Sequence, residues 1–219
     1  MLWVAATPVG NPDDLSISAL RLLQECDVII CESTKETSKL LRHHGVTGRT
    51  YEVLDEHSKP EDVEQLAELC RDKNVILVSD GGTPAFCDPG AHLVARCRAL
   101  NIPAKPVLGP SALMGLLSMA GARIDQFVFR GFPPAETEAR KKAFLEMQKE
   151  KRAMILMDTP YRMKKILAEV EEFFPRRQIF LARDLSLPEE RFLHGTPASV
   201  RQACRDDKAE FMLLIYADV

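Results

Sequence analysis

The feature that most constrains the fold is an apolar run, Val75–Val78, that ends in a glycine-rich loop. The run is continuously apolar rather than alternating, which is typical of a strand buried on both faces of a parallel sheet. Asp80 closes the run, and the loop after it contains Gly81, Gly82 and Gly90 with two prolines. Open α/β sheets bind ligands in the loops at the carboxyl ends of their strands. The segment therefore predicts a ligand-binding loop, with an ordinary strand-to-helix turn as the alternative.

The first half of the chain alternates apolar runs with segments of helical spacing, and Asp13 and Asp14 are candidate caps of the first helix. The expected strands are Leu2–Val9, Asp27–Glu32, Arg49–Leu54, Asn74–Asp80 and Ile102–Leu108. The expected helices are Leu15–Cys26, Thr37–His44, Pro60–Lys73, Gly90–Leu100 and Ser111–Ala120. Five such units predict a mostly parallel five-stranded sheet covered by helices on both faces.

The pattern changes near residues 121–125, after which short strands follow one another with fewer helices between them. The expected strands are Phe127–Phe132, Arg152–Asp158, Gln178–Ala182, Arg191–His194 and Glu210–Tyr216. The expected helices are Glu136–Lys149, Tyr161–Phe173 and Pro197–Arg205. Consecutive short strands imply antiparallel pairing, so this half predicts a mixed sheet. We expect two α/β domains, residues 1–118 and 119–219, with a ligand cleft where they meet.

Composition places the chain among ordinary globular proteins, with 46% hydrophobic and 28% charged residues. No segment resembles a signal peptide or a membrane helix, and six scattered cysteines indicate neither a disulfide framework nor a metal site. We therefore expect a cytoplasmic protein without a metal ion. The formal net charge of −3 gives no general affinity for nucleic acid, but basic clusters in the second half leave a local phosphate-binding surface open beside solvated helix faces.

Two further loops resemble the one after Val78. Thr7–Asp14 follows the first expected strand and Leu108–Gly115 follows the fifth, so all three should leave the same edge of the parallel sheet. The chain has no phosphate-binding G-x-x-x-x-G-K-[ST] motif, no dinucleotide-binding G-x-G-x-x-G motif and no G-x-S-x-G nucleophile motif. The residues alone thus predict a two-domain α/β protein with a cleft lined by backbone-rich loops.

The order of motifs ATPVGNPDDLS, DVIICESTKETSKLLRHHG, EHSKPED, VSDGGTPAFCDPG, GPSAL, FVFRGFPP and ILMDTPYR resembles one known family. It is the bacterial small-subunit ribosomal RNA 2′-O-ribose methyltransferases, within the tetrapyrrole methylase superfamily of S-adenosylmethionine (SAM) enzymes. The resemblance extends from residue 2 to about residue 184. It implies a homodimer of two-domain subunits that bind SAM in the interdomain cleft and use no metal.

The resemblance also implies the residues of the cofactor site. These are Pro8 and Val9 of the first loop; Asp80, Gly81, Gly82 and Thr83 of the second; Ser111 and Ala112 of the third; and Met157 of the second domain. Such residue types suit SAM, because a carboxylate pairs with its ammonium group and backbone amides bond its carboxylate.

Other motifs depart from the family pattern on the substrate side. Glu32–Lys35 reads Glu-Ser-Thr-Lys where the family usually has Glu-Asp-Thr-Arg, and Glu56–Lys59 reads Glu-His-Ser-Lys where it has Glu-His-Asn-Glu. Methylation of a ribosomal RNA ribose is therefore the first hypothesis. Methylation of a tetrapyrrole or another small molecule is the second, and a catalytically silent SAM-binding protein is the third.

Five polar residues are candidates for chemistry or substrate binding. Glu32 ends a buried strand and either orients substrate or caps the next turn, while His57 is either a general base for a ribose hydroxyl or a surface residue. Lys35, Arg130 and Arg162 are candidates to bind substrate phosphates.

Overall fold

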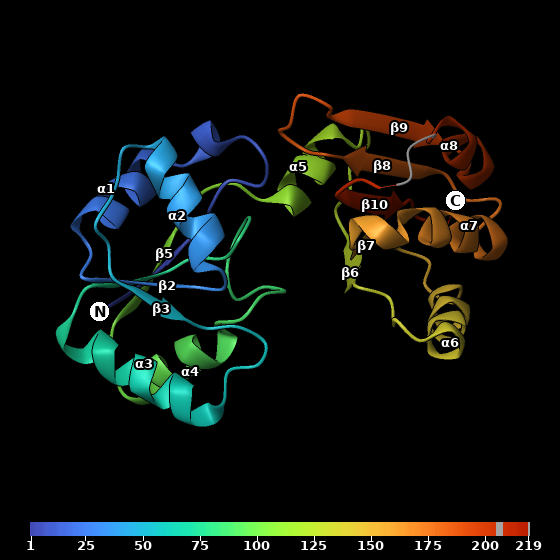
Figure 1. The fold of residues 1–219 in the computed structure, drawn as a ribbon. Helices are drawn as coiled ribbons and strands as arrows, with labels where there is room; N and C mark the ends of the chain where they lie inside the picture. The colour runs from blue at the N-terminus through green and yellow to red at the C-terminus, as the bar shows by residue number, and fades with distance from the viewer. Residues whose placement is uncertain (205–207, 219) are drawn as a thin grey trace. The chain divides into compact units, whose positions relative to one another are not determined.

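The computed structural model describes residues 1–204 and 208–218, which form two compact units, Met1–Ser111 and Ala112–Val219. Each unit contains one five-stranded sheet covered by helices on both faces (Figure 1). The fold class expected from the sequence, two α/β regions with a parallel and a mixed sheet, is therefore confirmed. The domain limits 1–118 and 119–219 stay a prediction.

The first sheet is entirely parallel, with strand order β3-β2-β4-β1-β5. Its strands are β1 (Leu2–Ala5), β2 (Val28–Cys31), β3 (Tyr51–Val53), β4 (Val75–Leu77) and β5 (Ala104–Val107). Its helices are the short 3₁₀ turn η1 (Pro12–Asp14), α1 (Ile17–Glu25), α2 (Thr34–His43), α3 (Pro60–Asp72) and α4 (Ala91–Ala99). Every expected strand is present and shorter than expected, but the fifth expected helix, Ser111–Ala120, does not cover this sheet: it is α5 (Ala112–Met119), which packs on the second one.

Two local expectations about the first unit are corrected. Asp13 and Asp14 do not cap the first long helix, because they lie in η1, whose own cap is Asn11. The cap of α1 is Ser16, whose hydroxyl accepts a hydrogen bond from the Ala19 amide at 3.1 Å. The first strand ends at Ala5 rather than at residue 9, since the chain then turns to pair with the loop after β4.

Different helices cover the two faces of the first sheet (Figure 1), and successive side chains of each strand point to opposite faces. Ile30 and Leu77 point to the face covered by α3 and α4, whereas Ile29 and Ile76 point to the face covered by α1 and α2. All four side chains are fully or almost fully buried. This double burial explains the continuous apolar sequence of the strands.

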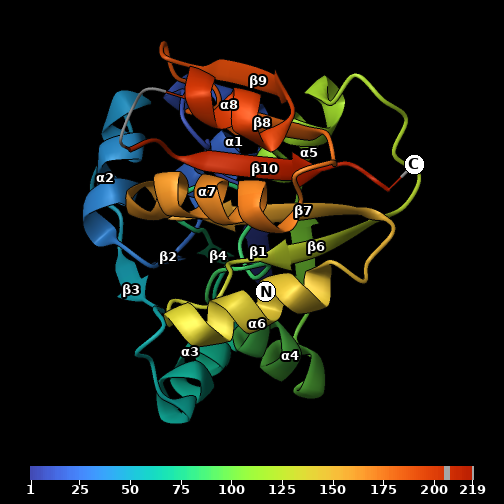
Figure 2. The ribbon, with the colours of Figure 1, turned by 90° about the vertical axis from the view of Figure 1, so that its right-hand side faces the viewer.

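The second sheet has strand order β6-β7-β10-β8-β9, with β6 parallel to β7 and every other pair antiparallel. Its strands are β6 (Phe127–Gly131), β7 (Ala153–Asp158), β8 (Ile179–Arg183), β9 (Arg191–Gly195) and β10 (Phe211–Ile215). Its helices are α5 (Ala112–Met119), α6 (Thr137–Met147), η2 (Pro160–Arg162), α7 (Met163–Phe173) and α8 (Pro197–Ala203). Side chains of α5 pack on one face, and those of α6, α7 and α8 pack on the other (Figure 2).

Candidate active site at the carboxyl edge of the first sheet

The strand order brings the three glycine-bearing loops together. β4, β1 and β5 are adjacent and parallel, so the loops that follow them leave neighbouring points of one sheet edge. From β1 the chain runs to α1 on one face, whereas from β4 it runs to α4 on the other. Neighbouring strands whose connections diverge in this way open a crevice, which is the usual ligand position in α/β sheets.

Direct contacts hold the loops after β1 and β4 in place. Thr7 and Gly82 exchange two backbone hydrogen bonds, each 2.9 Å long, and the Thr7 hydroxyl donates to the Ser79 carbonyl at 2.9 Å. Both Thr7 and Ser79 are buried. Gly82 has a φ of +86°, a conformation that few other residues adopt without strain. The base of this site is therefore pre-organised by the backbone.

The glycines of these loops have distinct roles. The amide of Gly82 is already bonded to Thr7, so it is not free to bond a ligand carboxylate. A Cβ on Gly81 would lie 3.4 Å from the Pro8 carbonyl oxygen, which shows how closely the two loops approach each other. A Cβ on Gly109, in the loop after β5, would lie 3.1 Å from Ala6 Cβ. Since Gly81 is exposed, a ligand can reach the backbone there.

Acidic side chains gather beside these loops, and Glu32 is the most perturbed of them. Burial, and after it the negative charges nearby, raise the pKa of Glu32 from its usual 4.5 to about 7. In order of decreasing effect, those charges belong to Asp88, Asp80, Glu56 and Asp55. They follow β4 and β3, the two neighbours of the strand that Glu32 ends. The fold therefore collects at one edge carboxylates that are far apart in the sequence.

One oxygen of Glu32, Oε1, is shielded from solvent and has no hydrogen-bond partner among the described residues. The alternative that Glu32 caps the following helix is wrong, because the cap of α2 is Ser33, whose hydroxyl accepts from the Glu36 amide at 3.3 Å. A shielded carboxyl oxygen without a partner is available to a proton or to a hydroxyl group of a ligand.

Burial also raises the pKa values of the Asp80 and Asp88 carboxyl groups above the usual value for aspartate. The Ser33 amide and the Ser79 hydroxyl, respectively, oppose these shifts through hydrogen bonds to the carboxylates. Such perturbed acids in one place are typical of functional sites.

Of the remaining predicted residues of the first unit, two are exposed and two are not. His57 is exposed in the turn after β3, where its amide donates to Asp55 Oδ1 at 2.9 Å. Lys35 is exposed in the first turn of α2, three residues after Glu32. Pro8 is buried beneath the loop after β4, and Val9 is half-buried. Whether these residues bind ligand stays a prediction.

In the second unit, Arg162 has structural partners of its own. It forms an ion pair of 3.1 Å with the buried Asp158 and donates to the carbonyls of Pro133 and Pro134 at 2.7 and 3.0 Å. Its role as a phosphate ligand stays a prediction, and these bonds compete with it. Arg130 lies exposed within β6.

Two further basic clusters of this unit, Arg140–Lys142 and Arg176–Arg177, each contain an inward-facing arginine. Arg140 is completely buried and donates from Nε to both carboxylate oxygens of Glu169, at 2.9 and 2.8 Å. Arg177 is buried and donates to the carbonyls of Glu150, Lys151 and Arg152. These arginines hold the unit together, so the surface available to phosphates is smaller than the sequence suggests.

The described residues contain neither a metal-binding cluster nor a membrane-spanning helix. No group of three or more histidine, cysteine, aspartate or glutamate side chains is placed to hold a metal ion in residues 1–204 and 208–218. Within the same ranges, no helix combines the length and apolarity needed to cross a membrane.

Comparison with known proteins gives consistent matches. The family model described as tetrapyrrole (corrin/porphyrin) methylases matches residues 1–200. A relative from Neisseria meningitidis named "Ribosomal RNA small subunit methyltransferase I" is 37% identical over 98% of this chain and 75% of its own length. Proteins of the same name from Synechocystis and Escherichia coli O157:H7 are 35% and 34% identical, each over 98% of this chain and over 78% and 77% of their own lengths.

Solved structures agree in fold. A diphthine synthase superposes with a TM-score of 0.73 at 12% identity, covering 98% of this chain and 89% of its own. The uroporphyrin-III C-methyltransferase of Thermus thermophilus, solved with S-adenosylhomocysteine, superposes with a TM-score of 0.65 at 18% identity, covering 98% and 96%. At these identities the likeness establishes the fold alone.

Proposed function

Because the chain belongs to the tetrapyrrole (corrin/porphyrin) methylase family, we propose that it is a SAM-dependent methyltransferase that methylates a ribose 2′-oxygen in small-subunit ribosomal RNA. The observation that carries this proposal is the match, over almost the whole chain, to relatives named as small-subunit ribosomal RNA methyltransferases. The divergent connections after β1 and β4 support it, because α/β sheets bind ligands beside such strands.

The residues at this edge fit SAM. Asp80 is a partly exposed residue whose carboxylate suits an ammonium group, and the exposed residues Gly81 and Thr83 suit a ligand that lies against their backbone. The backbone of Pro8 and Val9 lies directly beside Gly81, and we propose that these two residues border the cofactor. When bound, SAM supplies an electrophilic methyl group on a positively charged sulfur.

Four further cofactor positions rest on the resemblance. Gly82 shapes the loop through its bonds to Thr7. Ser111 and Ala112 join the third loop to α5, and both are half-buried. Met157 is half-buried near the end of β7. We propose that these residues contact the cofactor.

Glu32 is our candidate for the group that accepts the proton of the ribose hydroxyl. A carboxylate with a pKa of about 7 holds a proton more tightly than an ordinary glutamate, yet is largely ionised at slightly alkaline pH. Its shielded Oε1 offers a free acceptor for a hydroxyl group. His57 remains the second candidate, and its exposed position in a turn supports it less. Lys35 and Arg130 are exposed cations that suit the substrate's phosphates, with Arg162 as a third candidate.

A substrate panel tests the function. The protein is incubated with methyl-labelled SAM and one of three acceptors: small ribosomal subunits, naked small-subunit RNA, or a set of tetrapyrroles. We expect label in the RNA of the first or second acceptor. Label in a tetrapyrrole alone would favour the small-molecule hypothesis, and SAM binding without transfer to any acceptor would favour the silent binding protein.

A glycine variant tests the cofactor site. Gly81→Val places a branched side chain beside Pro8 in backbone that needs no positive φ, so the fold should persist while SAM binding weakens at least about tenfold. The control is Ala104→Val, at an exposed position at the start of β5, the end of the strand away from these loops. Calorimetry that finds equal SAM affinity for both variants would exclude this loop from the cofactor site.

We also propose that the protein is a cytoplasmic homodimer. Exposed apolar residues, among them Ile17, Met114 and Met119, are candidates for burial against a second copy. Five of the six cysteines are buried as free thiols, which suits a reducing compartment. Light scattering at tens of micromolar that shows a monomer would rule the dimer out.

A further inference from the structure

The outer edge of β3 is an open edge of the first sheet. β3 pairs only with β2, and the described residues contain no strand on its other side. The Ile29 amide donates to the Thr50 carbonyl at 2.9 Å, and the Leu54 amide donates to the Cys31 carbonyl at 3.0 Å. Alternation along a parallel strand then turns the amide and carbonyl of Val53 away from β2. Unpaired groups of this kind are a template for another extended chain.

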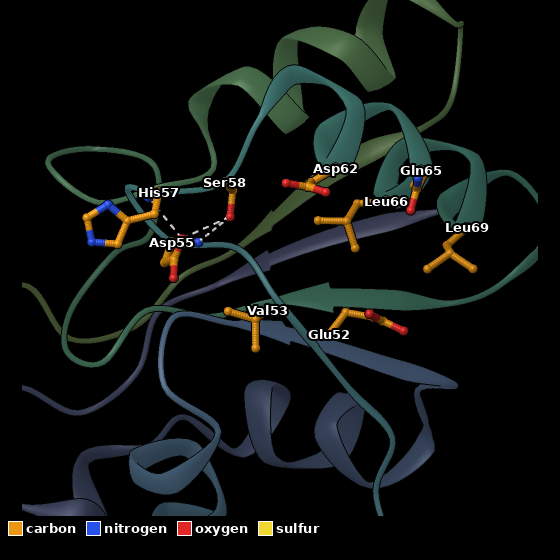
Figure 3. Close-up of a pocket in the computed structure, with 9 residues that line it drawn as sticks. All are labelled: Glu52, Val53, Asp55, His57, Ser58, Asp62, Gln65, Leu66 and Leu69. Carbon is orange, nitrogen blue, oxygen red and sulfur yellow. Dashed lines mark hydrogen bonds between the residues drawn. The ribbon is translucent and has the colours of Figure 1, made fainter.

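A pocket of about 600 Å³ lies along this edge, between β3 and α3 (Figure 3). It is lined by Glu52, Val53, Asp55, His57, Ser58, Asp62, Gln65, Leu66 and Leu69. Three carboxylates thus line it with two leucines, and no lysine or arginine does. In Figure 3, the His57 ring points away from the side chains of α3.

Two of the three carboxylates accept hydrogen bonds from the protein, and none of the three forms an ion pair among the described residues. Asp62 Oδ2 accepts from the Lys59 amide at 2.8 Å, and Asp55 Oδ1 accepts from the amide of His57 and the hydroxyl of Ser58. Those donors are uncharged, so the negative charges are not neutralised. Glu52 is exposed and forms no ion pair with any described residue.

This combination specifies one kind of occupant. Carboxylates and leucine side chains that line one pocket suit a lysine or arginine, whose long stem packs on apolar surface while its charged end reaches the acids. The open edge of β3 suits an extended backbone, which adds as a strand. Three uncompensated carboxylates repel the phosphates of a nucleic acid. We propose that the β3 edge binds an extended, basic segment of a partner protein, with one basic side chain in the pocket.

The proposal is tested with a capped peptide of alternating threonine and lysine, titrated into the ¹⁵N-labelled full-length protein. We expect amide shifts confined to β3 and the first two turns of α3. A glutamate peptide of the same length should cause none. Glu52→Lys should weaken binding about tenfold or more, because it removes one attractive charge and adds a repulsive one.

Substitutions at Val53 test strand addition separately from charge. Val53→Pro removes an outward amide that β2 does not use, so the fold should persist while peptide binding falls about tenfold. Val53→Thr keeps the amide and should bind within about twofold of the parent. Fluorescence of the only tryptophan, Trp3, verifies that each variant is folded.

Three results would overturn the proposal: equal binding of the glutamate peptide, unchanged binding by Val53→Pro, or peptide-induced shifts remote from β3 and α3. A ribosomal RNA hairpin that shifts the amides of β3 and α3 but not those around Glu32 would also overturn it, because the pocket itself would then bind nucleic acid. None of these results depends on methyl transfer, so the proposal and the proposed function fail separately.

Discussion

Replacing Glu32 by glutamine should stabilise the first unit at alkaline pH and leave it almost unchanged at acidic pH. The native carboxyl is half-buried beside other acids, and its pKa of about 7 means that the fold disfavours its ionised form. Below about pH 4.5 the carboxyl is protonated in both the folded and the unfolded protein, so it does not oppose folding. As the pH rises from there through 7, the unfolded protein ionises more readily than the folded one, and the free energy of unfolding falls. Glutamine has nearly the same shape and carries no charge at any pH.

The size of the effect follows from the shift. The pKa of Glu32 is about 7 instead of 4.5, and a difference of one in pKa corresponds to about 1.4 kcal/mol, which gives an upper bound of about 3.5 kcal/mol. Part of the side chain remains in contact with solvent, which screens the repulsion. We expect Glu32→Gln to raise the free energy of unfolding by about 1–3 kcal/mol at pH 8 and by less than about 0.5 kcal/mol at pH 4.5.

Urea unfolding followed by Trp3 fluorescence measures this quantity, because the only tryptophan lies in β1 of the same unit. The parent and the variant are compared between pH 4.5 and 8.5. Glu25→Gln, at the exposed end of α1, is the matched control and should change stability little at either extreme. A gain for Glu32→Gln that is equal at pH 4.5 and pH 8, or a loss at pH 8, would refute the reasoning.

Two further predictions concern stability. Gly90→Ala should destabilise the first unit by about 2–4 kcal/mol in urea unfolding, because φ is +128° and the new Cβ would lie 2.6 Å from Leu77 Cδ2. The control Gly45→Ala, at a φ of +71° with open space around it, should lower the free energy of unfolding by only about 1–2 kcal/mol. Arg140→Ala should lower the stability of the second unit by about 3–5 kcal/mol, since it leaves the Glu169 carboxylate nearly buried without its partner. Replacing both Arg140 and Glu169 by apolar residues should lower the stability less than Arg140→Ala alone. Thermal unfolding in which the double variant is less stable than Arg140→Ala would contradict this account.

The fold was largely predictable from the sequence because double burial leaves continuous apolar runs in the strands. The ends of elements were less predictable. Asp13 and Asp14 are good cap residues by type, yet Pro12 starts a separate 3₁₀ turn there, and Ser16, an equally good cap residue, caps α1. Which of several suitable residues caps a helix depends on how the preceding loop packs, and the cap preferences of single residue types do not include that packing.

The candidate site was predictable in part. Glu32 at the end of a strand and the glycines near Asp80 are visible in the sequence. Their convergence with Asp88 is not, because it depends on β4 lying between β2 and β1. Likewise, a run of basic residues does not reveal that Arg140 faces inward, since its partner Glu169 is 29 residues away.

The most direct test of the central claim is the chemical position of the transferred methyl group. Small-subunit RNA labelled by this protein and methyl-labelled SAM is hydrolysed with alkali, which needs a free ribose 2′-hydroxyl at each cleaved linkage. We predict that the label appears in alkali-resistant dinucleotides, and that Glu32→Gln lowers its yield at least about tenfold at pH 8. Label recovered only in mononucleotides would place the methyl group on a base and contradict ribose methylation.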